Sequence, residues 1–103
     1  MLSKIKIKLT FGTFILNTSK GIIEKDKRKI ELTKNELKIL HYLAKNRENI
    51  VSREDIIDNL WENESFIDDN TLTVNMTRLR HKLEELGVKN CIETKRGQGY
   101  ILK

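Results

Sequence analysis

Residues 69–86 constrain the fold more than any other stretch, because apolar side chains recur along them at helical spacing. The intervals between the apolar positions are four, three, four and three residues, which places them on one face of a long amphipathic helix. A glycine follows directly, as is typical of a helix C-terminal cap. The apolar stripe is Leu72, Met76, Leu79, Leu83 and Leu86, and the glycine is Gly87.

The opposite face of this helix is polar and basic. At about 100° per residue, it carries hydrogen-bonding side chains, two arginines and a single apolar residue, Val74. The alternative for Val74 is packing on another protein element, and for the arginines a solvated face paired with nearby glutamates. The candidate contact residues on this helix are Asn70, Thr73, Val74, Asn75, Thr77, Arg78 and Arg80.

The chain before this helix predicts a small antiparallel sheet and two further helices. Polar and apolar residues alternate over 4–9, and short apolar segments follow around Gly12 and Gly21, which together indicate three or four strands. Thr33 to Glu36 form a capping box, so a helix is expected over 33–46. A second capping pattern at 52–55 opens a short helix that ends near Trp61.

The chain after the long helix predicts a β-hairpin. Two short apolar segments, 91–95 and 99–102, are joined by Arg96-Gly97-Gln98-Gly99. Glycine permits the positive φ angles of a tight turn, and the arginine makes the tip basic.

Charge is distributed unevenly along the 103 residues. Residues 1–47 hold 12 Lys+Arg against 4 Asp+Glu, residues 48–69 hold 1 against 8, and residues 70–103 hold 7 against 3. An anionic polymer can therefore meet the two basic ends while the acidic middle faces elsewhere.

Length and composition exclude several classes of protein. We expect a single domain over 1–103, since the chain is too short for a cleft between two domains. One cysteine and two distant histidines predict no disulfide and no metal, and the absence of paired carboxylates or a nucleophile–base pair argues against an enzyme. No cofactor is expected. Short apolar runs predict neither a membrane span nor a signal peptide, which leads us to expect a cytoplasmic protein.

Together these elements predict an α+β winged helix-turn-helix with an N-terminal antiparallel sheet, three helices and a C-terminal hairpin wing. The arrangement fits double-stranded DNA, because a helix fills the major groove and a narrow basic tip reaches the minor groove. Arg78 would bind base edges or phosphates, Val74 a thymine methyl, and Arg96 an A·T-rich minor groove. The alternative is a winged-helix module that docks its third helix on another protein.

Four blocks of sequence, taken together, resemble the C-terminal effector domain of OmpR/PhoB-type response regulators. They are residues 32–40, 51–61, 69–80 and 94–100, and the resemblance covers essentially the whole chain. It implies a transcription regulator of a two-component system, with residues 69–86 as the recognition helix. Val74 and Arg78 occupy base-reading positions, Asn75 and Arg80 phosphate-facing positions, and Arg96 the minor-groove position. The other positions of the wing and of the DNA backbone contact are Trp61, Thr94, Lys95, Gly97 and Tyr100.

The resemblance also interprets the acidic middle of the chain. In the family, the loop before the third helix can touch RNA polymerase, and here it contains Glu62, Glu64 and Asp68. The alternative is that these carboxylates only orient the domain by keeping away from DNA.

Two details refine the resemblance. Many relatives carry arginine where this chain has Asn70 and Thr77, so a shallower salt dependence of binding is expected. Residues 66–75 look like the branch of Gram-positive regulators paired with peptide-sensing ABC transporters, the BceR-like and GraR-like group. The phosphorylated receiver domain of such regulators is absent from this chain. The isolated domain is expected to be a monomer that binds direct repeats as a tandem dimer.

Overall fold

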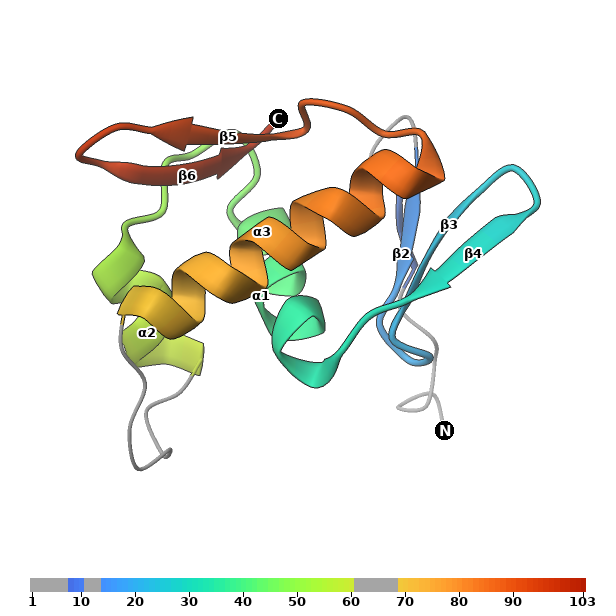
Figure 1. Ribbon diagram of the computed structural model, residues 1–103, viewed down its shortest axis with the longest axis horizontal. Coiled ribbons are helices and arrows are strands. Elements are labelled where there is room, and N and C mark those ends of the chain that lie inside the picture. Colours follow the sequence, from blue (N-terminus) through green and yellow to red (C-terminus); the bar gives the residue numbers. More distant parts are fainter. Residues whose placement is uncertain (1–7, 11–13, 61–68) are drawn as a thin grey trace.

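The computed structural model describes residues 8–10, 14–60 and 69–103, and in these the predicted α+β winged helix-turn-helix is confirmed. The long helix α3 (Asp69–Leu86) crosses the middle of the molecule, with α1 (Lys34–Lys45) behind it (Figure 1). The N-terminal sheet lies beside the C-terminal end of α3. The hairpin of β5 (Ile92–Lys95) and β6 (Gly99–Leu102) lies beside its N-terminal half (Figure 1).

The N-terminal sheet has four antiparallel strands in sequential order. They are β1 (Lys8–Thr10), β2 (Ile15–Asn17), β3 (Ile22–Lys25) and β4 (Arg28–Glu31). The register sets Leu16 opposite Ile23, and Ile23 opposite Ile30, so apolar side chains share one face. That face is buried in the core, while residues 4–7 of the expected first strand lie outside the described residues.

Helix α1 begins with the predicted capping box. The Thr33 side chain accepts a hydrogen bond from the Glu36 backbone at 3.2 Å, and the Glu36 carboxylate accepts one from the Thr33 backbone at 2.8 Å. Ile39, Leu40 and Leu43 of this helix are fully buried in the core, whereas Leu37 and Ala44 pack against it and are partly buried.

Helix α2 (Arg53–Leu60) is capped from both ends. The Ser52 hydroxyl accepts from the Asp55 backbone at 3.0 Å, which is the first bond of the expected capping pattern. At the other end the Lys38 ammonium donates to the Leu60 carbonyl at 3.3 Å, so α1 supplies the charge that the end of α2 favours.

Helix α3 has the bounds that its pattern predicts and packs its apolar stripe into the core. Leu72, Met76, Leu79, Leu83 and Leu86 are at most 2% exposed. Gly87 ends the helix with φ at +98°, and Val88 N–H donates to the Leu83 carbonyl at 2.8 Å, in a Schellman-type cap.

The hairpin is attached to the body of the domain through the segment before α2. Val51 and Tyr100 exchange two backbone hydrogen bonds of 2.8 and 2.9 Å, and Glu48 N–H donates to the Leu102 carbonyl. Gly99, with φ at +141°, makes this approach sterically feasible, because a Cβ there would lie 2.0 Å from the Val51 carbonyl oxygen.

Candidate nucleic-acid interface

The polar face of α3 points to solvent, as the sequence predicts. Thr73, Thr77 and Arg78 are exposed, as is Asn70 in the first turn. Val74 is 44% exposed in the middle of this face and is one of only two large apolar side chains, with Ile50, that the described residues leave exposed. Since the stripe on the other side of the helix is buried, this exposure follows from how α3 packs on α1.

The expectation that the Asn75 amide faces outward is wrong. Asn75 is 9% exposed, and its Nδ2 donates to the Thr71 carbonyl at 2.8 Å, one turn earlier in α3. Asn75 lies next to Met76 in the buried stripe, so rotation of the helix takes it inward. It satisfies its buried amide within the helix instead of offering it to a ligand.

The hairpin presents its turn to solvent. Arg96, Gly97 and Gln98 are exposed, and Gln98 N–H closes the turn by donating to the Lys95 carbonyl at 2.8 Å. Gly97 has φ at +73°, the left-handed conformation that glycine adopts without strain. The tip is therefore a narrow, basic loop that projects from the domain.

A carboxylate on β5 partly neutralises the base of the hairpin. Glu93 pairs with Lys103 at 3.1 Å and with Lys95 at 3.2 Å, and these two hydrogen bonds hold the pKa of the Glu93 carboxyl below its ordinary value. Lys95 is thus engaged within the wing. Arg96 remains as the exposed cation at the tip.

Arg80 and Thr94, which the sequence assigned separately, are brought together by the fold. The Arg80 Nη2 donates to the Thr94 hydroxyl, which links α3 to β5. The Arg80 guanidinium carbon lies 5.6 Å from the centroid of the Tyr100 ring, within range of a cation–π contact. Tyr100 itself is 5% exposed, so its ring is a packing element between helix and wing.

Arg53, in the first turn of α2, is a member of this cluster that the sequence analysis missed. Its Nη2 donates to the Thr73 hydroxyl at 2.8 Å, and its Nη1 donates to the Tyr100 hydroxyl. The sequence showed Arg53 only within a capping pattern. No periodicity connects it with residues 20 and 47 positions away.

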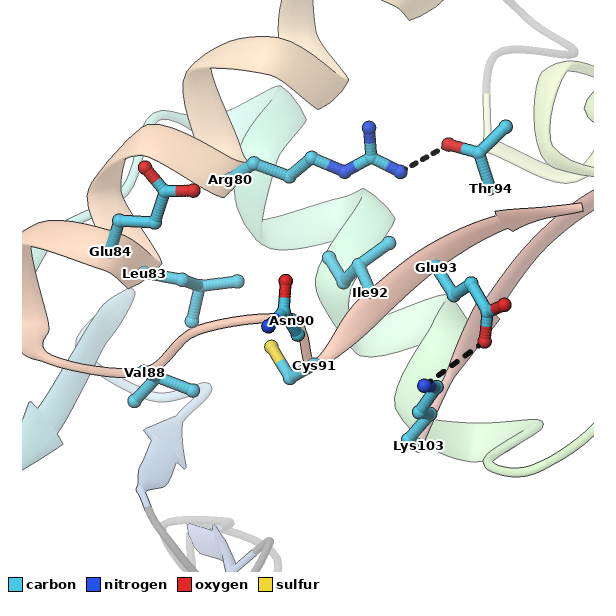
Figure 2. A pocket seen from close by; sticks show the side chains of 10 residues that line it. All are labelled: Arg80, Leu83, Glu84, Val88, Asn90, Cys91, Ile92, Glu93, Thr94 and Lys103. Atoms are coloured by element: carbon cyan, nitrogen blue, oxygen red, sulfur yellow. Dashed lines mark hydrogen bonds and ion pairs between the residues drawn. The ribbon is translucent and has the colours of Figure 1, made fainter.

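A groove of about 560 Å³ lies between the C-terminal half of α3 and the start of β5. Figure 2 shows Arg80 reaching along it to Thr94, with Leu83, Val88, Cys91 and Ile92 below and the Glu93–Lys103 ion pair at one end. Burial raises the pKa of the Cys91 thiol to about 11, so this cysteine is a packing residue with little thiolate at neutral pH. The imidazole of His41 in α1 is also partly buried. Its pKa is lowered, mainly by this burial and to a lesser extent by the positive charge of Lys45.

Several expected positions cannot be placed. Trp61 and the acidic loop residues Glu62, Glu64 and Asp68 lie outside the described residues. Among the residues that are described, no group of three potential ligands is arranged to hold a metal ion. None of the helices in that part of the chain combines the length and the apolar character needed to cross a bilayer.

Comparison with known proteins gives consistent matches. Residues 27–102 match the family model described as "Transcriptional regulatory protein, C terminal". The chain is 50% identical over 88 residues to the sensory transduction protein BceR of Bacillus subtilis, covering 85% of this chain and 38% of BceR. It is 47% identical over 93 residues to the response regulator GraR of Staphylococcus aureus strain MRSA252, covering 90% of this chain and 42% of GraR. The expected likeness to the BceR-like and GraR-like group is thereby confirmed, and the chain spans about two fifths of these relatives.

Solved structures show the same fold. The C-terminal domain of the nisin resistance regulator NsrR, a lantibiotic response regulator, superimposes with a TM-score of 0.80 at 47% identity, covering 91% of this chain and 95% of that domain. The DNA-binding domain of Klebsiella pneumoniae RstA, solved in complex with the RstA box, superimposes with a TM-score of 0.76 at 23% identity. That match covers 92% of this chain and 95% of the RstA domain.

Proposed function

The chain belongs to the family of C-terminal domains of transcriptional regulatory proteins, and from this premise we propose that it is the sequence-specific DNA-binding output domain of a two-component response regulator. The observation that carries the proposal is the exposed, hydrogen-bonding face of α3 beside a projecting basic wing. A fold that presents a helix and a hairpin in this way matches the major groove and the adjacent minor groove of B-DNA. The chain acts by binding, without catalysis or a cofactor.

Each part of the interface has a distinct task. In the major groove, the Arg78 guanidinium donates to guanine or to phosphate, and Val74 packs on a thymine methyl. Thr77 and Asn70 border this contact and supply hydroxyl and amide groups, and Thr73 lies beside them on the same exposed face. At the tip of the wing, Arg96 enters the minor groove, where A·T-rich sequence concentrates negative potential.

The Arg80–Thr94 pair suits a phosphate between the two grooves. Arg80 already lies beside the wing, so its charge needs little reorganisation to meet the DNA backbone.

The remaining parts of the proposal concern the intact regulator. A receiver domain outside this chain controls the output domain by phosphorylation, in the cytoplasm. This chain alone is a monomer, and two copies bind direct repeats in tandem on DNA. RNA polymerase is a second partner, through the acidic loop that contains Glu62, Glu64 and Asp68.

Selection of bound duplexes from random DNA, followed by titration of the recovered site by fluorescence anisotropy, tests the proposal. We expect a recurring sequence and an affinity that falls linearly on a logarithmic scale as salt increases. The proposal would be contradicted if no common sequence were recovered and if the affinity for DNA did not change with salt concentration. That result would favour the alternative, a winged-helix module that docks on protein through the exposed face around Val74.

A further inference from the structure

Arg53 joins the two parts of the proposed DNA interface. From the start of α2 its guanidinium contacts Thr73 on the recognition face of α3, with 2.8 Å between Nη2 and Oγ1. The same group donates through Nη1 to the phenol of Tyr100 on β6. A single side chain thus holds the helix and the wing together from a third element.

The chemistry of arginine suits this task. Its planar guanidinium presents donors in a fixed fork, so two acceptors bonded to it are held at a set distance and angle. The Tyr100 hydroxyl belongs to a ring that is 5% exposed. The guanidinium carbons of Arg53 and Arg80 lie 5.7 and 5.6 Å from the centroid of this ring, and Arg80 in turn bonds Thr94. Arg53 and Arg80 therefore fix one tyrosine between the recognition helix and the hairpin.

Binding to two grooves at once depends on the distance between the groups that enter them. If the wing moves relative to α3, occupying both grooves at once requires the wing to be fixed in one position. The entropy lost in fixing it reduces the binding free energy, as for two modules joined by a flexible linker. Among the described residues, the backbone hydrogen bonds between the wing and the body of the domain are those at 48–51. Side-chain contacts must therefore set the angle of the wing to α3.

We infer that Arg53 is a positioning residue for DNA recognition, which aligns the wing with the recognition helix through Tyr100 and Thr73. This inference rests on the proposed DNA-binding function. It assigns Arg53 no direct contact with DNA and assigns the Thr73 hydroxyl to an internal bond in place of a base.

A double-mutant cycle on the selected duplex tests it. Arg53→Ala is expected to weaken binding about tenfold in the wild-type background, since a bond to a charged donor is lost at each end. In the Thr73→Val/Tyr100→Phe background, both hydroxyl acceptors are absent, but an aromatic ring remains at position 100, where the Arg53 guanidinium carbon lies 5.7 Å from the ring centroid. The same change should weaken binding there by less than about threefold, so that most of the loss depends on the two hydroxyls. Arg53→Lys should lose most of the effect of arginine, because an ammonium group lacks the planar fork.

A second readout separates positioning from general stability. The wild-type domain should prefer an A·T-rich flank to a G·C-rich flank through Arg96, and Arg53→Ala should reduce this ratio towards one while circular dichroism shows a folded domain at the assay temperature. Lys45→Ala removes the same charge from an exposed site on α1 and should leave the ratio unchanged.

The outcomes distinguish the inference from its premise. A loss on Arg53→Ala that persists in the double-mutant background, with a shallower salt dependence, would mean a direct phosphate contact and would overturn the inference. An unchanged affinity and flank ratio would overturn it as well. If the wild-type domain selects no DNA sequence, the proposed function itself fails before Arg53 is tested.

Discussion

The carboxylate of Glu36 and the ammonium group of Lys82 form an ion pair of 2.6 Å between α1 and α3, with the Glu36 side chain only 1% exposed. The same carboxylate closes the capping box at Thr33, and Lys82 also donates to the Glu31 carbonyl at 3.0 Å. The recognition helix is therefore joined to the sheet and to α1 through one buried charge. Lys82 lies one turn after Arg78 in α3, so this pair helps to set the orientation of the proposed DNA face.

Removing the cation should leave that charge without compensation. We expect Lys82→Met to lower the free energy of unfolding by about 2–3 kcal/mol, because a buried carboxylate that loses its partner retains its desolvation penalty. Urea denaturation followed by circular dichroism measures the change. The double variant Glu36→Gln/Lys82→Met should regain much of the loss, since glutamine still accepts from Thr33, and a single variant as stable as wild type would refute the argument.

The two wing glycines should respond differently to alanine. Gly99→Ala should cost at least about 3 kcal/mol, because the added Cβ meets the Val51 carbonyl oxygen at 2.0 Å in a backbone conformation unfavourable to L-residues. Gly97→Ala should cost about 1 kcal/mol, since its Cβ meets nothing within 4 Å and only the left-handed conformation is penalised. Thermal melts of the two variants provide the comparison. An equal loss of stability in both would show that the close approach of Gly99 to the Val51 carbonyl does not matter.

The C-terminal end of α3 is stabilised by cations from the β3–β4 hairpin. Lys25 Nζ donates to the Gly87 carbonyl at 3.2 Å and Arg28 to the Glu85 carbonyl, whereas the last turn of α3 contains no basic residue. Lys25→Ala and Arg28→Ala should each lower stability by about 0.3–1 kcal/mol, more at low salt. Lys27→Ala in the same hairpin is the control and should change stability by less than about 0.5 kcal/mol.

Substitutions of Arg78 and Arg96 should change DNA binding in different ways. Arg78→Ala should cost about 1–3 kcal/mol of binding free energy and relax base preference in the recovered site, because a base-edge donor is lost. Arg96→Ala should chiefly weaken binding to duplexes with A·T-rich flanks. Titration of both variants against site and flank variants of the duplex checks this, and identical sequence profiles for the two would contradict separate major- and minor-groove tasks.

The thiol of Cys91 should be slow to react. With the pKa raised from 9.0 to about 11, the thiolate fraction near pH 8 is roughly a hundredfold lower than in the unfolded chain. A disulfide reagent should therefore modify the native domain far more slowly than the domain in urea. Because the folded pKa is the higher one, the contribution to stability is complete below about pH 9 and is lost as the pH rises through 11.

The alanine variant provides the control for this pH effect. Cys91→Ala removes the titrating thiol, so its unfolding free energy should fall less between pH 8 and pH 10.5 than that of the wild-type domain. If the unfolding free energy of the two proteins fell equally with pH, or if the native and unfolded thiols were modified equally fast, the Cys91 thiol that lines the groove in Figure 2 would not be protected by burial.

Local signals predicted most of the secondary structure. The 4-3-4-3 spacing of apolar residues placed α3 at its observed bounds, and Thr33 and Gly87 marked ends that the structure confirms. These features work because capping bonds and one-sided burial act over a few residues. Asn75 was the exception, since a position at the edge of the stripe is decided by how far the helix rotates against α1.

The sequence by itself determined which elements form, which face of α3 is apolar, and that the hairpin tip is basic. Only the tertiary structure decided that Arg53 meets Thr73 and Tyr100, that Arg80 meets Thr94, and that Glu36 is buried against Lys82. Those pairs join residues 14 to 47 positions apart on different elements. Apolar periodicity and capping patterns in the sequence reflect interactions within one helix or strand. How one element packs on another depends on the shape of the whole core.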